Sequence, residues 1–183
     1  MFPGKQMNKR IPKELELAID YLSSECHLDT LEALNHTRDA FHSTRKLIKD
    51  AAISGQIEEM YALVNKEYPD LLKKHPQIVS LVFSQIFIEY VRNKRPEKAL
   101  EFGRKSIQNG QNITENQELF LLLAYKNPEQ CDDLKDLMSL ARREMIFTKV
   151  DEIIKEKHLG RKVSLLEYAH KIIAYCKAID NTE

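Results

Sequence analysis

Residues 77–93 read QIVSLVFSQIFIEYVRN, and this stretch decides the fold. Its apolar side chains recur around nearly the whole circumference of a helix rather than along one stripe: Ile78, Val79, Leu81, Val82, Phe83, Ile86, Phe87, Ile88, Tyr90 and Val91. A helix of this kind must be packed on several sides. The β-branched residues would also suit a strand, but the length of the stretch favours a helix. We therefore predict a buried central helix over 77–93.

A polar corner follows this helix. The segment RNKRPEKALEFGRK, residues 92–105, holds six basic residues around Pro96, which could indicate a nucleic-acid contact. Cations at the end of a helix also complement its dipole, and proline is favoured in the first turn of the next helix. The chain carries 28 basic and 28 acidic residues, so no net charge attracts a polyanion. We interpret the corner as a helix boundary and expect no nucleic-acid partner.

The same pattern of helix, polar corner and helix occurs 39 residues earlier. RKLIKDAAISGQIEEMYALV from Arg45 aligns with SQIFIEYVRNKRPEKALEFG from Ser84, matching Leu47 with Ile86. Helical hairpins that recur at about 40 residues stack into α-solenoids. The sequence therefore predicts an all-α protein of stacked helical hairpins.

In the rest of the chain, glycines mark the ends of predicted helices and prolines mark their starts. No Asn-Gly or Asp-Gly turn lies between alternating segments, so hairpins of strands are not expected. The predicted helices cover residues 13–25, 28–40, 43–54, 57–68, 70–74, 77–93, 96–109, 114–125, 129–138, 140–158 and 163–179.

The two terminal helices carry apolar seams. The last helix repeats apolar residues with 4-3-4-3 spacing at Leu165, Ala169, Ile172, Cys176 and Ile179. The first helix repeats them with 4-3-4 spacing at Leu15, Ile19, Leu22 and Cys26. Such seams pack on another helix, in the same chain or in a partner. We expect the two terminal helices to pack together. The seams agree both with an internal core and with a partner interface.

Length and composition limit the classes of protein to which the chain can belong. A chain of 183 residues fits one compact domain, or two small ones that share a core. Three widely spaced cysteines suit a reducing compartment, and the first fourteen residues lack the apolar run of a signal peptide. The longest apolar stretch, residues 78–91, is too short and too polar to span a bilayer. We expect a cytoplasmic and nuclear protein.

Three consecutive motifs resemble a known family. AIDYLSSECHLDTLEALNHT, residues 18–37, resembles a LisH motif. GQIEEMYALVNKEYPDLLKKHPQIVSLVFSQIFIEYVRNKRPEKALEF, residues 55–102, resembles a CTLH motif. LLAYKNPEQCDDLKDLMSLARREMIFTKVDEIIKE, residues 122–156, together with the last helix resembles a CRA segment. The chain is thus similar to the LisH-CTLH-CRA family, relatives of Ran-binding protein M. The resemblance implies a flexible terminus at 1–13, LisH at 14–41, CTLH at 42–104 and CRA at 105–183, with LisH and the end of CRA as one unit.

Small members of this family are scaffold subunits of GID/CTLH-type E3 ubiquitin ligases. The resemblance therefore implies a non-catalytic scaffold with two association surfaces, one from LisH and the end of CRA, the other from CTLH and early CRA helices. The implied partners are other LisH-CTLH-CRA proteins, including subunits that bear a RING domain, or a second copy of this chain. The residues expected at the first surface are Ile19, Leu22, Leu31, Leu34, Ile172 and Cys176.

The sequence departs from the family pattern at the LisH turn. Cys26 and His27 stand where the family usually has a glycine and an aromatic residue, which bears on the geometry of the turn and on homodimerisation. No SPRY domain, RING finger or set of zinc ligands is found, so we expect another subunit to recruit the ubiquitin-charged enzyme.

Motifs for catalysis were not found. The six histidines form no H-x-x-x-H or H-E-x-x-H pair, and no phosphate-binding or nucleophile-elbow glycine motif occurs. We expect no catalytic residues, no cofactor and no metal. The alternative to a ligase scaffold is a signalling or cytoskeletal adaptor that uses the same helices to bind a small GTPase or tubulin.

Overall fold

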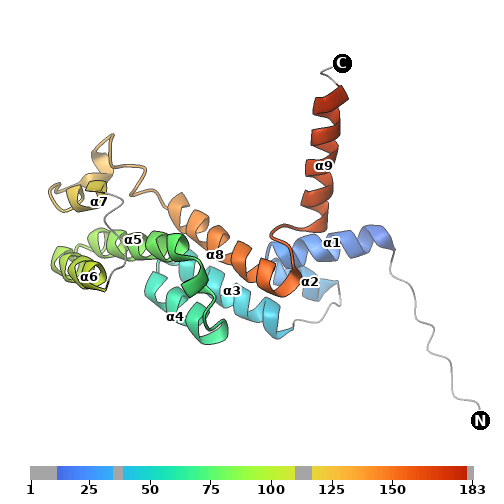
Figure 1. Cartoon of the computed structure of the whole chain (residues 1–183), viewed down its shortest axis with the longest axis horizontal. Helices are drawn as coiled ribbons and strands as arrows, with labels where there is room; N and C mark the ends of the chain where they lie inside the picture. Colours follow the sequence, from blue (N-terminus) through green and yellow to red (C-terminus); the bar gives the residue numbers. More distant parts are fainter. Residues whose placement is uncertain (1–11, 35–38, 110–116, 181–183) are drawn as a thin grey trace, which may run out of the picture. The chain divides into compact units, whose positions relative to one another are not determined.

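The computed structural model describes residues 12–34, 39–109 and 117–180 (Figure 1). Within these ranges the chain is helical and contains no strand, which confirms the all-α prediction. The chain divides into two compact units: unit 1 combines residues 1–42 with 163–183, and unit 2 holds residues 43–162.

The elements of each unit are as follows. Unit 1 contains α1 (Lys13–Ser24), α2 (Leu28–Ala33) and α9 (Leu165–Asp180). Unit 2 contains α3 (Ala40–Ile53, which begins at the end of unit 1), α4 (Ile57–Glu67), η1 (Leu72–Lys74), α5 (Pro76–Arg92), α6 (Pro96–Gln108), α7 (Gln117–Leu121), η3 (Pro128–Gln130) and α8 (Ala141–Leu159).

Helix α5 is the hub of unit 2. It contacts α4, α6, α7, α8 and η1, and the side chains that it buries lie all around its axis: Ile78, Val82, Ser84, Gln85, Ile86, Phe87, Ile88, Glu89 and Val91. The prediction of a central helix packed on several sides is confirmed. An apolar core forms where Phe87, Ile88 and Val91 meet Leu119 and Leu122 from the α7 segment.

The hairpins α3–α4 and α5–α6 share one corner geometry. Gly55 and Lys94, which are 39 residues apart, both adopt a left-handed backbone, with φ of +83° and +57°. Each donates its N–H to the carbonyl three residues back, and the next residue, Gln56 or Arg95, donates to the carbonyl five residues back, at 2.9 Å in both corners. These are the bonds of a Schellman motif at the end of a helix. The 39-residue repeat predicted from the sequence is therefore confirmed at the level of individual hydrogen bonds.

A third corner of the same kind joins α1 to α2 in unit 1. Cys26 has φ of +57°, its N–H donates to Ser23 O, and the N–H of His27 donates to Leu22 O at 2.9 Å. The cysteine thus adopts the left-handed conformation that glycine adopts most readily, which an L-residue does at a cost of about 1 kcal/mol. The turn at Cys26 and His27 thus closes with the same two hydrogen bonds as the corners at Gly55 and Lys94. Sequence comparison at a 39-residue offset missed this corner, because it lies 29 residues before Gly55.

Helix α8 joins α3 through a buried ion pair. Arg45 on α3 is fully buried, and its Nε and Nη2 donate to the two carboxylate oxygens of Asp151 at 2.6 and 2.8 Å. Lys155, one turn further along α8, lies 3.2 Å from the same carboxylate. A bidentate pair of this geometry fixes both the distance and the register of two helices. Removing either partner would leave a buried charge, which costs about 3–5 kcal/mol.

A second ion pair joins α8 to α5 and to the end of α3. Arg143 donates from Nε and Nη2 to the carboxylate of Glu89 at 2.8 and 2.7 Å, and from Nη1 to the carbonyl of Ile53 at 3.0 Å. The guanidinium therefore satisfies one of the free carbonyls at the C-terminal end of α3 while it neutralises a buried carboxylate on α5. It lies directly against Gly55, whose missing side chain leaves room for it.

Four predicted helices differ from the structure. The segment expected as a helix over 70–74 contains only the short 3-10 helix η1, and of the helix expected over 114–125 the structure describes α7, Gln117–Leu121, followed by turns, while residues 114–116 lie outside the described ranges. The helix expected over 28–40 ends at Ala33, and a new helix begins at Ala40. The segment expected as a helix over 129–138 is instead η3 followed by isolated turns. Three aspartates, which have low helix propensity, occur within eight residues there, and burial of Leu134 and Met138 in the core holds the segment without a continuous helix.

We predict that Gly55→Ala lowers the free energy of unfolding by about 3 kcal/mol, measured by urea denaturation. About 1 kcal/mol comes from the positive φ of an L-residue. The rest comes from displacing Arg143, because an added Cβ would lie 2.6 Å from its Cζ and the guanidinium would lose charged hydrogen bonds.

Gly160→Ala is the matched control. Gly160 also has a positive φ, +69°, but no atom lies within 4 Å of an added Cβ. We expect it to cost only about 1 kcal/mol. Equal losses in the two variants would contradict the role given to Arg143.

Candidate interaction surfaces

Unit 1 presents α9 as a projecting helix. The N–H of Leu165 donates to the carboxylate of Asp20 on α1 at 2.7 Å, which fixes the start of α9 against α1. Ser164 is fully buried, and its Oγ accepts from the N–H of Glu167 at 3.1 Å as a helix N-cap. The contact between α1 and α9 confirms that the terminal helices pack together. Beyond its first turns, α9 extends away from α1 and α2 (Figure 1).

The apolar side chains of α9 are exposed. Seven large ones remain between 46% and 68% accessible to solvent: Leu165, Leu166, Tyr168, Ile172, Ile173, Tyr175 and Ile179. Helices α1 and α2 add four more exposed apolar side chains to unit 1: Leu15, Leu17, Tyr21 and Leu34. An accumulation of exposed apolar side chains along one helix, as on α9, is typical of a site for another protein.

The six residues expected at this surface all lie in unit 1, at different depths. Ile19 and Leu22 on α1 are half-buried, and Leu31 on α2 belongs to the interior, with 3% exposed. The other three, Leu34, Ile172 and Cys176, are exposed.

Two of the six residues lie beyond the point where α9 is fixed to α1. Ile172 and Cys176 lie about 10 and 16 Å along α9 from Leu165, where the helix is fixed to α1, at the usual rise per residue. Their role in an interface stays a prediction.

Sequence reasoning missed two tyrosines on α9. Tyr168 and Tyr175 are the most exposed of its large apolar residues, at 58% and 68%. Together with Ile172 and Ile179 they form a second seam with 4-3-4 spacing, which was visible in the sequence. Tyrosine is enriched in protein interfaces because it combines large apolar area with a hydrogen-bonding hydroxyl.

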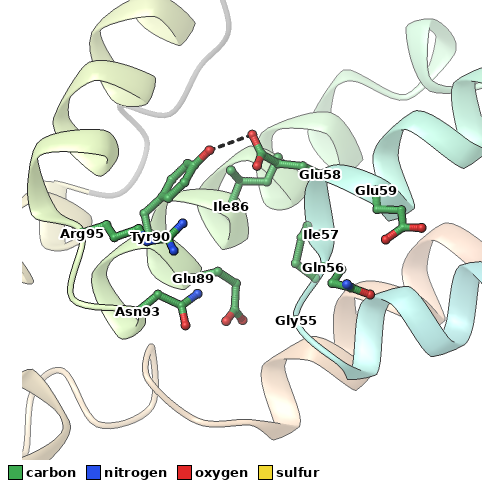
Figure 2. A pocket seen from close by; sticks show the side chains of 10 residues that line it. All are labelled: Gly55, Gln56, Ile57, Glu58, Glu59, Ile86, Glu89, Tyr90, Asn93 and Arg95. Carbon is green, nitrogen blue, oxygen red and sulfur yellow. Dashed lines mark hydrogen bonds between the residues drawn. The ribbon is translucent and has the colours of Figure 1, made fainter.

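Unit 2 contains a cleft of about 290 Å³ between the α3–α4 corner and the α5–α6 corner (Figure 2). The corner of α3–α4 contributes Gly55, Gln56, Ile57, Glu58 and Glu59, and the end of α5 with its corner contributes Ile86, Glu89, Tyr90, Asn93 and Arg95. The Tyr90 hydroxyl donates across the cleft to Glu58 Oε1 at 2.8 Å. Burial, and then this hydrogen bond to a carboxylate, raise the pKa of the Tyr90 phenol.

Glu89 at the base of this cleft is a structural anion. Burial tends to raise the pKa of its carboxyl, but hydrogen bonds from Arg143 and Gln85 and the charges of Arg143 and Arg92 outweigh burial, so the pKa is lowered. Gln85 donates to Glu89 at 2.8 Å and accepts from Arg142 Nε at 3.0 Å. A carboxylate held ionised by so many donors is a poor proton acceptor, so the cleft offers no general base at this position.

The residues described by the structure contain no cluster of three or more His, Cys, Asp or Glu that could hold a metal ion. Over the same residues, no helix has the length and apolar character needed to cross a membrane. The three thiols are separate, with Cys26 buried, Cys131 half-buried and Cys176 exposed.

Stacked helical hairpins with an exposed terminal helix define an all-α protein without a recognisable reaction centre in the described residues. Residues 41–178 match the model of the CTLH/CRA C-terminal to LisH motif domain, and the chain belongs to this family. The match begins where the LisH-like segment ends, so the LisH resemblance of residues 14–41 stays a prediction.

Two curated relatives have similar sequences. The chain is 28% identical over 114 residues to the glucose-induced degradation protein 8 homolog of Nematostella vectensis, covering 60% of this chain and 50% of that protein. It is 26% identical over 115 residues to the protein GID8 homolog of Arabidopsis thaliana, covering 60% of this chain and 47% of that protein. The chain thus spans about half the length of these relatives.

We predict that Glu89→Gln lowers the free energy of unfolding by about 3 kcal/mol at pH 7, because Arg143 loses its buried counterion. The folded pKa of Glu89 lies below the ordinary value of 4.5. Its stabilising effect is therefore complete above that pH and is lost as the pH falls through the folded pKa. Urea unfolding at pH 7, 5 and about 3 should show the difference between wild type and variant shrinking as the pH falls.

Glu101→Gln provides a matched control. Glu101 also has a lowered pKa, caused by Lys105, but both side chains of this pair are about two-thirds exposed. Solvent screens such pairs, so we expect no measurable change in stability. A pH-independent loss in Glu89→Gln would contradict the assignment of an ionised, paired carboxylate.

Proposed function

We propose that the chain is a non-catalytic scaffold subunit of a GID/CTLH-type multi-subunit E3 ubiquitin ligase. Membership of the CTLH/CRA family and similarity to two proteins named as homologues of glucose-induced degradation protein 8 support this proposal. The observation that carries it is the exposure of seven large apolar side chains on α9. A helix with this surface is suited to bind another helix rather than to remain in water.

Energy considerations favour an interface larger than α9 alone. Burying a half-exposed aliphatic or aromatic side chain contributes about 1 kcal/mol, so seven of them contribute about 7 kcal/mol. Association itself costs on the order of 4–15 kcal/mol in lost translational and rotational freedom. We therefore expect the exposed residues of α1 and α2, including Tyr21 and Leu34, to contribute to the first interface as well. Ile19 and Leu22 support it at its edge, and Leu31 supports it from within.

A second interface lies at the α6–α7 end of unit 2. Leu100 and Ile107 on α6 are exposed at 36% and 43%, and Leu121 and Tyr125 of the α7 segment are exposed at about half. The ring of Phe102 on α6 stacks on Phe83 of α5 at 5.3 Å, which helps to hold α6 against α5. We assign the second association surface of the family to this end.

The partners in this proposal are other LisH-CTLH-CRA proteins, including subunits with a RING domain, or a second copy of the chain. Catalysis, cofactors and metals belong to those other subunits. The place of action is the cytoplasm and the nucleus. Affinity purification with mass spectrometry from cells that express the tagged chain tests the proposal. Recovery of RING-bearing LisH-CTLH proteins supports the ligase, whereas recovery of a small GTPase or tubulin without them would favour the adaptor.

We predict that Ile172→Arg abolishes association through the first interface. Ile172 is 47% exposed, so the variant should fold normally, but the new charge would be buried without a partner in any complex. Light scattering behind size exclusion measures a homomeric complex, and recovery of partners in affinity purification measures a heteromeric one. A tenfold or greater loss is expected.

Leu47→Arg is the matched control, because Leu47 lies on α3 of unit 2 and is 58% exposed. It introduces the same charge at an exposed apolar position outside both proposed interfaces. An unchanged complex in the folded Ile172→Arg variant would contradict the assignment of α9.

A further inference from the structure

A second cleft, of about 270 Å³, lies in unit 2 where the segment after α4 meets the C-terminal half of α8. Its apolar floor includes Leu71 and Ile153, which are otherwise buried with 5% exposed. Both lie in well-packed elements, since Leu71 immediately precedes η1 and Ile153 belongs to the buried face of α8. The floor is therefore a fixed apolar surface at the bottom of a polar rim.

The charges on the rim of this cleft are unbalanced. Both of its carboxylates are neutralised by lysines outside the lining: Asp70 by Lys73 at 2.5 Å and Glu156 by Lys162 at 3.4 Å. The two lysines inside the lining, Lys74 and Lys157, have no carboxylate within ion-pair distance among the described residues. The cleft thus presents two ammonium groups that make no direct ion pair with a carboxylate of the described residues.

Two further observations place positive potential in the cleft. Lys73, by a hydrogen bond and its charge, lowers the pKa of the Asp70 carboxyl, and Lys74 and Lys157 lower it further, which shows that the fields of both rim lysines reach one point. His75, also in the lining, immediately precedes α5, whose first turn contains no acidic residue. The positive end of the α5 dipole therefore adds to the two lysines.

Lys157 also makes an aromatic contact with Tyr68, which lies next to the cleft in sequence but is not part of its lining. The Nζ of Lys157 lies 5.8 Å from the centroid of the Tyr68 ring, a cation–π arrangement that limits the freedom of a long exposed side chain. The entropy lost when Lys157 binds an anion is correspondingly smaller.

We propose that this cleft binds an acidic peptide segment of a protein partner. A glutamate or aspartate side chain of the peptide lies between Lys74 and Lys157, and an adjacent aliphatic side chain covers Leu71 and Ile153. An inorganic anion would satisfy the lysines but leave the apolar floor in water, so the combination favours a peptide. None of its lining residues belongs to the two proposed association surfaces, and the proposal does not depend on the ligase assignment.

Selection from a random dodecapeptide phage library on the whole chain tests the proposal. Enriched peptides should place an acidic residue next to an aliphatic one. Synthetic copies should bind Lys74→Glu/Lys157→Glu at least tenfold more weakly than wild type, measured by fluorescence anisotropy. Lys98→Glu/Lys126→Glu, which changes the charge of unit 2 equally at two exposed lysines outside the cleft, should change binding less than twofold.

Two-dimensional amide NMR of the labelled protein locates the bound peptide. We expect saturable shifts at Leu71, His75 and Ile153, and none when the acidic residues of the peptide are replaced by their amides. The proposal is overturned if no acidic peptide is enriched, if the enriched peptides bind both double variants equally, or if inorganic phosphate produces the same shifts at lower concentration than the peptide.

Discussion

The packing of unit 2 depends on the ion pairs that α8 makes with α3 and α5. Arg45 with Asp151 and Arg143 with Glu89 are directional, and each guanidinium engages both oxygens of its carboxylate. Apolar packing alone tolerates sliding of one helix along another, whereas a bidentate pair allows a single register. With α8 fixed at two points, the hub helix α5 is enclosed on its remaining side. The cleft between the helix corners and the cleft beside η1 then follow as gaps of defined shape.

The three helix corners have the same backbone structure in different surroundings. Cys26, Gly55 and Lys94 share the same left-handed conformation and the same pair of closing hydrogen bonds. Only Gly55 requires the absence of a side chain, because Arg143 occupies that space. At the other two corners the chain tolerates an L-residue at a cost of about 1 kcal/mol. Tertiary packing therefore explains Gly55, and the other two corners show that the turn itself does not require a glycine.

Much of this fold was predictable from the sequence because its hydrophobic patterns are long. The central helix was evident from apolar residues on every side, and the second corner from the match of its neighbours to those of the first. The ion pairs were not predictable from the sequence. An arginine on an amphipathic helix, such as Arg45, is usually solvated, and nothing in the local sequence identifies Asp151, 106 residues away, as its partner. For the candidate surfaces, the spacing of apolar residues in α9 indicated a seam. It did not indicate that the seam is exposed to solvent, because exposure depends on which other helices pack on α9. The cleft with Lys74 and Lys157 could not be predicted from the sequence, because its excess positive charge arises only when Asp70 and Glu156 pair with other lysines.

The division of the chain into units has a consequence for its biosynthesis. Unit 1 is built from the first and the last segments of the chain, so α1 and α2 leave the ribosome long before α9 exists to contact them. Within unit 2, Arg45 and Glu89 likewise emerge before the helix that supplies Asp151 and Arg143. Contacts between residues so distant in sequence form late and leave apolar surface exposed during synthesis. The nascent chain must therefore remain soluble with these contacts unmade until α8 and α9 have been synthesised, a period in which a chaperone or an early-bound partner would have most effect.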